Sequence, residues 1–241
     1  MAKQTLFISD LHLCEERPHT LTLFETFMRD RAPGIDALYI LGDLFEAWVG
    51  DDDRCEANER IEASIKSLVD AGTAVFFMHG NRDFLIAQAF SERTGASLLT
   101  DPSVINLYGQ ATLLMHGDSL CTDDLKHQEY RATAYTEQGK AQLLAHPLDA
   151  RLAMASAARK KSQANKELTP AAIMDVNLDA VSDAMREHQV SHLIHGHTHR
   201  HAHHEFDLDG NTAHRYVLRE WVTEGATLVC SESGCVEEVI E

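Results

Sequence analysis

Aspartate, asparagine and histidine residues recur in short clusters along the sequence. They offer carboxylate, amide and imidazole groups without a thiolate, a mixture that suits divalent ions such as Mn²⁺, Fe²⁺ or Zn²⁺. Two such ions about 3.5 to 4 Å apart can activate a water and bind the phosphoryl oxygens of an in-line displacement. The candidate ligands are Asp10, His12, Asp43, Asn81, His116, His197 and His199. Their types predict a dinuclear metal site for phosphoryl chemistry.

Each cluster taken alone also has an ordinary structural explanation. Asp10 or Asp43 could cap a helix, and Asn81 could supply a turn. His116 could be a buried, hydrogen-bonded histidine, and His197 with His199 could lie on an exposed strand edge. All the clusters follow apolar segments in one chain, however, and this joint pattern favours the metal site.

The apolar segments before the clusters predict strands, and helical spacing between them predicts helices. Alternating strands and helices indicate an α/β fold with helices on the faces of a sheet. Ligands bind beyond the carboxyl ends of strands in such sheets, so we expect the clusters to converge. The predicted strands are 5–10, 37–41, 74–78, 111–115 and 192–194, with closing strands at 215–222, 227–230 and 236–240, and the helices are 20–31 and 58–71.

Residues 123–170 interrupt this alternation and predict a helical insertion over the site, within a single domain spanning 1–241. The segment contains Leu143, Leu144, Leu148 and Leu152, followed by the basic run 159–161. We expect the leucines to form an apolar stripe and the basic run beside it to dock on an anionic membrane. The alternative is a plain helical cover with a solvated basic end.

Composition limits the partners and the compartment. The 241 residues include 21 basic and 38 acidic side chains, a net charge of −17, which disfavours a broad nucleic-acid-binding face. The five cysteines are scattered, odd in number and without metal-ligand spacing, as expected for a reducing cytoplasm. No apolar run approaches the ~20 residues of a membrane-spanning helix.

The order Asp-x-His, Gly-Asp, Gly-Asn, His and Gly-His-x-His resembles the calcineurin-like metallophosphoesterases over nearly the whole chain. The resemblance implies a four-layer α/β/β/α sandwich with a helical insertion. The flanking residues, among them those of 39–52 and 79–85, resemble the branch that acts on UDP-2,3-diacylglucosamine in bacterial lipid A synthesis. It implies manganese-dependent pyrophosphate hydrolysis to UMP and 2,3-diacylglucosamine 1-phosphate. We therefore expect a monomeric, peripheral protein on the cytoplasmic side of the inner membrane.

The resemblance also implies a role for each matching residue. Asp10, His12, Asp43 and His199 would hold one Mn²⁺, and Asp43, Asn81, His116 and His197 the other, with Asp43 bridging. Asp43, Asn81, Arg82 and His116 would be catalytic. Substrate contacts would come from Asn81, Arg82, Asp124, Ser162 and His197, with two more aligned at Lys166 and Thr169, where threonine replaces the family's lysine.

Arg82 can also be interpreted from its chemistry. Many relatives have histidine there, which can protonate an alkoxide leaving group. A phosphate leaving group needs charge neutralisation more than a proton, and arginine supplies that charge. Arg82 thus favours a pyrophosphate substrate, unless it is simply a surface residue in a turn. The other functions considered are a phosphodiesterase or phosphatase acting on a nucleotide or phosphoprotein, and a non-catalytic scaffold, although a scaffold would be expected to lack ligands.

Overall fold

The computed structural model describes residues 3–168 and 175–241, so the predicted contact at Thr169 lies outside the described residues. For residues 163–168 only the helical backbone is described. The strands are β1 (Thr5–Ile8), β2 (Ala37–Leu41), β3 (Ala74–Met78), β4 (Ser97–Leu99), β5 (Ser103–Leu107), β6 (Gln110–Leu114), β7 (His192–His195), β8 (Ala202–Leu208), β9 (Asn211–Val217), β10 (Gly225–Ser231) and β11 (Gly234–Ile240). The helices are α1 (Pro18–Thr26), which continues as the π-helix η1 (Phe27–Arg31), α2 (Glu56–Asp70), α3 (Gln88–Thr94), the 3₁₀ turn η2 (Asp118–Leu120), α4 (Leu125–Ala134), α5 (Glu137–Leu144), α6 (Leu148–Leu168) and α7 (Leu178–Glu187).

The strands form two sheets. The first has the order β11-β10-β1-β2-β3-β4. Strands β1 to β4 are parallel to one another, and β10 is antiparallel to both of its neighbours, β1 and β11. The second has the order β5-β6-β7-β9-β8, with β6, β7 and β9 parallel. Parallel strands in each sheet point their carboxyl ends the same way, which gives the loops after them a common edge.

The apolar side chains form three cores, because successive side chains of a buried strand point to opposite faces of its sheet. In β1, Leu6 and Ile8 pack in the core that includes the residues of α1 and α2, whereas Phe7 packs in a second core with Leu114 and Ile194 of the other sheet. This follows from the two-residue period of side chains on a strand. A third core joins β6, β7 and β9 to α7.

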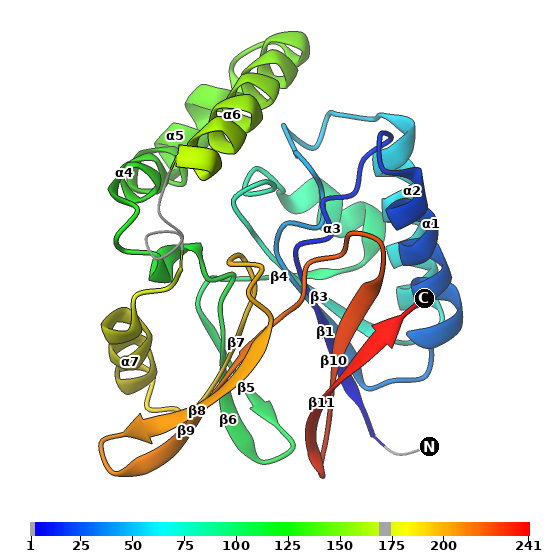
Figure 1. Ribbon diagram of the computed structural model, residues 1–241. Helices are drawn as coiled ribbons and strands as arrows, with labels where there is room; N and C mark the ends of the chain where they lie inside the picture. Colours follow the sequence, from blue (N-terminus) through cyan, green and yellow to red (C-terminus); the bar gives the residue numbers. More distant parts are fainter. Residues whose placement is uncertain (1–2, 169–174) are drawn as a thin grey trace.

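Figure 1 shows the resulting layers: α1, α2 and α3 cover the first sheet, and α7 lies against the second. The predicted four-layer α/β/β/α arrangement is therefore confirmed. Helices α4, α5 and α6 fall within the predicted insertion and stand beyond the ends of the strands (Figure 1). Among the described residues, no helix has the length and apolarity needed to cross a membrane.

The insertion is fastened to the loop after β2 by one buried side chain. Arg151 of α6 donates hydrogen bonds to the backbone oxygens of Val49 and His146 and to the carboxylate of Asp52. Its side chain is only 6% exposed, so these acceptors replace the water that it loses. This contact orients α6 with respect to the strand ends.

The closing strands differ from the prediction. A strand was predicted at 215–222, but β9 ends at Val217 and pairs with β8, which was not predicted. Most side chains of β8 are polar and partly or fully exposed, so its apolar alternation is weak. The turn residues Asp209 and Gly210 between the two strands both have positive φ, and the Asp-Gly pair is the signal that could have indicated this hairpin.

The cysteines also differ from the expectation of scattered thiols. Cys230 of β10 and Cys235 of β11 are directly opposite in the antiparallel pair and form a disulfide. The two cysteines are opposite because of the register of the β10–β11 hairpin, which their spacing in the sequence does not indicate. Cys14, Cys55 and Cys121 are free.

Candidate metal centre

The seven predicted ligands follow five strands drawn from both sheets. Asp10 and His12 follow β1, Asp43 follows β2 and Asn81 follows β3, all in the first sheet. The second sheet contributes His116 after β6, and His197 and His199 after β7. The clusters converge because the two sheets pack face to face with these strand ends at a shared edge.

The backbone at this edge is held in uncommon conformations. Eight non-glycine residues in the described part of the chain have positive φ, and five of them are Asp10, His12, Asp43, His197 and His199. Such conformations cost about 1 to 3 kcal/mol each and concentrate at functional sites. The strain is therefore confined largely to the predicted ligands.

Gly42 shows why the ligand loops need glycine. Its φ is +87°, and a Cβ there would lie 2.5 Å from the Gly80 nitrogen and 2.6 Å from His116 Nδ1. The two loops could not approach this closely around any larger residue. Gly42 thus lets Asp43, Asn81 and His116 come together.

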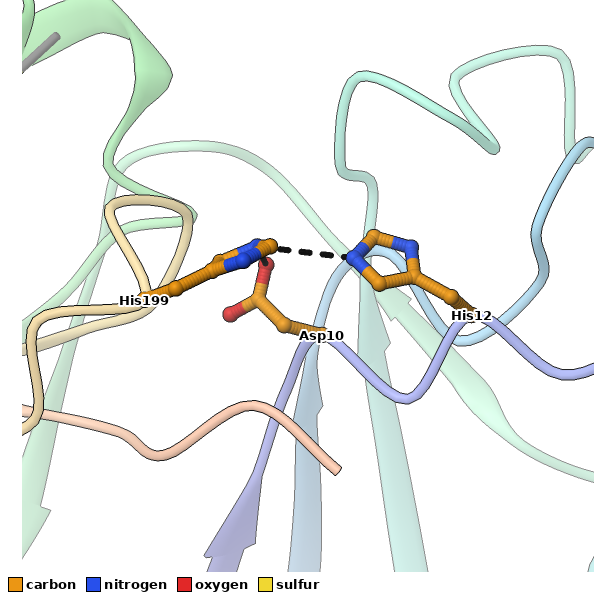
Figure 2. Close-up of side chains that lie close together, drawn as sticks. All are labelled: Asp10, His12 and His199. Atoms are coloured by element: carbon orange, nitrogen blue, oxygen red, sulfur yellow. Dashed lines mark hydrogen bonds and ion pairs between the residues drawn. The ribbon is translucent and has the colours of Figure 1, made fainter. Parts of the chain in front are cut away.

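One cluster consists of Asp10, His12 and His199, whose side chains point toward one another in Figure 2. His199 Nε2 lies 3.4 Å from Asp10 Oδ1 and 3.4 Å from His12 Nε2. Asp10 Oδ2 accepts hydrogen bonds from the Ser9 hydroxyl at 2.6 Å and from the His197 backbone at 2.9 Å. Asp10 Oδ1 is buried without a hydrogen-bond partner, so it is free to bind a cation.

A second cluster consists of Asp43, His116 and His197, to which Asn81 adds its amide oxygen. Asn81 Oδ1 lies 3.2 Å from His116 Nε2 and 2.9 Å from His197 Nδ1. His116 Nδ1 faces the Leu41 carbonyl oxygen at 2.8 Å, an acceptor that leaves Nε2 free for a cation. These are the four residues predicted for one ion.

The electrostatics of the second cluster favour positive charge. Burial acts to lower the pKa of His116, but Asp43 and Asp10 raise it to about 9. The pKa of Asp43 rises to about 7, first because of burial and also because Asp83 and Asp10 lie near. For His197, burial and His116 lower the pKa to about 3, which keeps the imidazole neutral as a metal ligand must be.

These observations fit a pair of divalent cations. The donors are carboxylate, amide and imidazole groups, one buried carboxylate oxygen has no hydrogen-bond partner, and nearby carboxylates raise the pKa of His116. Structure brings all seven predicted ligands together in two groups, and their assignment as ligands stays a prediction.

The residues predicted to contact substrate are placed more widely. The Arg82 backbone donates to Asp43 Oδ1 at 2.8 Å, and its guanidinium lies 3.4 Å from Glu46 Oε1. Asp124 caps α4 by accepting from the His127 backbone at 3.1 Å. Ser162 is exposed on α6, and Lys166 lies in the same helix, where side chains are not described. Only Arg82, Asn81 and His197 are thus joined to the metal clusters by described contacts.

Several residues around the ligands were not predicted as site residues. The buried carboxylate of Asp83 accepts from the backbones of Gly80 at 2.7 Å and Leu44 at 2.8 Å, joining the loops after β2 and β3. Its proximity to Asn81 in sequence was the available signal. Glu220 contacts His199 at 2.7 Å, although nothing in its sequence context indicated this.

Comparisons with known proteins agree with this geometry. Residues 3–201 match the model of the family described as calcineurin-like phosphoesterase. The chain is 49% identical over 217 residues to UDP-2,3-diacylglucosamine hydrolase of Marinobacter nauticus, covering 90% of this chain and 89% of that protein. It is 46% identical over 237 residues to the protein of the same name from Xanthomonas axonopodis, covering 95% and 96% of the two chains.

Solved structures resemble the fold at low sequence identity. An archaeal phosphodiesterase matches with a TM-score of 0.50 and 12% identity, covering 98% of this chain and 99% of that one. Vacuolar protein sorting 29 from Cryptosporidium parvum matches with a TM-score of 0.50 and 14% identity, covering 99% and 90%. These likenesses support the architecture alone. The family and relative matches confirm the resemblance that the motifs indicated.

Proposed function

The chain belongs to the calcineurin-like phosphoesterases, and from this premise we propose that it hydrolyses the pyrophosphate bond of UDP-2,3-diacylglucosamine. The products are UMP and 2,3-diacylglucosamine 1-phosphate, an intermediate of lipid A synthesis. The substrate is supported by the names of relatives that are 46% to 49% identical over most of the chain. The observation that carries the reaction type is the pair of ligand clusters at the shared edge of the two sheets.

We propose two Mn²⁺ ions as the cofactors. Asp10, His12 and His199 would hold one, and Asn81, His116 and His197 the other, with Asp43 between them. When bound, such ions supply Lewis acidity and an activated water. The chain's own part is to present these donors in fixed positions, through the positive-φ backbone and the close approach at Gly42.

Arg82 has a separate task in this proposal. Its backbone donates a hydrogen bond to Asp43, and its guanidinium donates one to Glu46. The arginine can form two parallel hydrogen bonds to a phosphate and cannot lose its charge at neutral pH. It therefore stabilises the phosphate that leaves when the pyrophosphate bond breaks.

The insertion would bring the protein to its lipid substrate. Leu144 and Leu152 are 40% and 44% exposed, and Lys160 and Lys161 are exposed further along α6. Each basic residue near an anionic leaflet contributes about 1 kcal/mol to binding. We propose peripheral attachment of a monomer to the cytoplasmic side of the bacterial inner membrane, with Leu144 and Leu152 against the acyl chains. Leu143, also part of the predicted apolar stripe, is partly buried and packs against the apolar core instead.

Product analysis tests the proposal. The purified protein is incubated with UDP-2,3-diacylglucosamine in detergent micelles, with Mn²⁺ or with a chelator, and the products are identified by mass spectrometry. We expect UMP and the sugar 1-phosphate in equal amounts only when Mn²⁺ is present. Release of inorganic phosphate, or faster turnover of a soluble nucleotide diester than of the lipid substrate, would instead favour the general phosphatase or phosphodiesterase.

A further inference from the structure

Glu220 lies beside the candidate ligands His199 and His12, and its Oε1 is 3.9 Å from His12 Nε2, too far for a hydrogen bond. Its Oε2 is 2.7 Å from His199 Nδ1, while His199 Nε2 faces Asp10 and His12 on the other side of the ring. Figure 2 shows the His199 side chain pointing toward those two residues. Because a carboxylate accepts hydrogen bonds, the proton of the neutral ring belongs on Nδ1, and the lone pair of Nε2 is left for a cation.

His116 and His12 lack such a partner in the described part of the chain. The outer nitrogen of His116 faces the neutral carbonyl of Leu41. The outer nitrogen of His12 is buried without a hydrogen-bond partner, 3.9 Å from Glu46 and too far for a hydrogen bond. A charged acceptor at hydrogen-bond distance thus distinguishes His199 from His116 and His12.

The backbone beside Glu220 is anchored to the site. The Trp221 backbone N–H donates to the Asp10 carbonyl at 3.1 Å, and Arg17 donates to the Trp221 carbonyl at 2.6 Å. The Trp221 ring is fully buried, and its Nε1 donates to the Ala226 carbonyl at 2.8 Å. Glu220 therefore meets His199 from a segment that is fixed to the ligand Asp10 itself.

We propose that Glu220 is a positioning residue for the cation held by Asp10, His12 and His199. It selects the Nδ1–H form of His199, fixes the orientation of the ring and adds negative charge beside the cluster. Partners of this kind typically contribute 10- to 100-fold to metal affinity. The inference rests on the proposed dinuclear site. In that site Glu220 raises the affinity for the ion held by Asp10, His12 and His199, and leaves the affinity for the ion near Asn81 unchanged.

Mn²⁺ titration of the metal-free full-length protein tests the inference, with free Mn²⁺ measured by electron paramagnetic resonance. We expect Glu220→Ala to weaken one of two binding events by about 10- to 100-fold and to leave the other within about threefold. Glu220→Gln should lose less, because its amide oxygen still accepts from Nδ1. Glu224→Gln is the matched control, since it removes the same charge from an exposed position nearby and should change neither event.

A second measurement separates positioning from a general structural role. Nitrogen chemical shifts of the His199 ring report which nitrogen carries the proton. In the metal-free protein at a pH where the ring is neutral, we expect Nδ1–H in the parent and in Glu220→Gln, and a mixture of the two forms in Glu220→Ala. Unchanged Mn²⁺ affinities in Glu220→Ala, equal weakening of both events, or an unchanged ring form would each overturn the inference. A parent protein that binds no Mn²⁺ would overturn the dinuclear proposal as well.

Discussion

Replacement of Gly42 with alanine would test whether close packing of the ligand loops creates the site. The φ of +87° imposes a cost of about 1 to 2 kcal/mol on any residue with a Cβ. In addition, the new Cβ would lie 2.5 Å from the Gly80 nitrogen and 2.6 Å from His116 Nδ1. Overpacking of this kind adds about 1 to 3 kcal/mol. We therefore expect Gly42→Ala to lose roughly 2 to 5 kcal/mol of unfolding free energy.

Gly34 provides the matched control for the conformational cost of a positive φ. Its φ is +80°, but a Cβ added there would meet no heavy atom within 4 Å beyond its chain neighbours. Gly34→Ala should therefore lose only the conformational part, about 1 to 2 kcal/mol. Urea unfolding of the two metal-free variants measures the difference, which we attribute to contact with Gly80 and His116.

The two variants should also differ in function. Displacement of His116 or Asn81 by about 1 Å would lower turnover by about 10²-fold, whereas Gly34→Ala should retain the parent rate. The reasoning is refuted if Gly42→Ala is no less stable than Gly34→Ala, or if it keeps both its turnover and its affinity for a second Mn²⁺.

Other changes probe separate parts of the account. Asp43→Ala should abolish turnover, because the carboxylate between the two clusters is lost; a rate above about a tenth of the parent, only ~1.4 kcal/mol of transition-state stabilisation, would contradict the bridging role. Arg82→Ala should slow pyrophosphate hydrolysis much more than hydrolysis of an aryl phosphodiester with a good leaving group, and equal losses in the two steady-state assays would show that Arg82 only positions the common phosphoryl group. Arg151→Ala should speed proteolysis and hydrogen exchange in α6 while leaving Mn²⁺ binding unchanged, because its guanidinium ties the insertion to the loop after β2; unchanged exchange would mean that other contacts fasten α6. Charge reversal at Lys160 and Lys161 should weaken binding to anionic vesicles, measured by sedimentation, by more than the ~1 kcal/mol that each lysine contributes; binding that survives at low salt would contradict membrane docking by this run.

The ligand residues could be predicted from sequence because each follows an apolar strand. A parallel sheet aligns the carboxyl ends of its strands, so residues as distant as Asp10 and His199 can be expected to meet. Their types also indicate the chemistry. The structure groups Asp10 with His12 and His199, and Asp43 with His116 and His197, and it places the amide oxygen of Asn81 beside the last two. That these groups bind metal, with Asp43 shared by both, stays a prediction.

Other features depend on contacts that leave no local pattern. The role of Glu220 becomes evident only when the segment after β9 is placed against Asp10. β8 was missed because it is largely polar, and the disulfide between Cys230 and Cys235 depends on the register of a hairpin. Contacts of the insertion are equally non-local, as the bond between Arg151 and Val49 illustrates.

The most direct test of the central claim is pyrophosphate hydrolysis measured as a function of bound metal. Metal-free protein is loaded with increasing Mn²⁺, bound ions are counted, and the release of UMP from UDP-2,3-diacylglucosamine is followed on the same samples. The account predicts that turnover is absent without metal and reaches its maximum at two ions per chain, with the sugar 1-phosphate formed in equal amount. Full activity with no bound ion or with one, or products that arise from another bond, would contradict it.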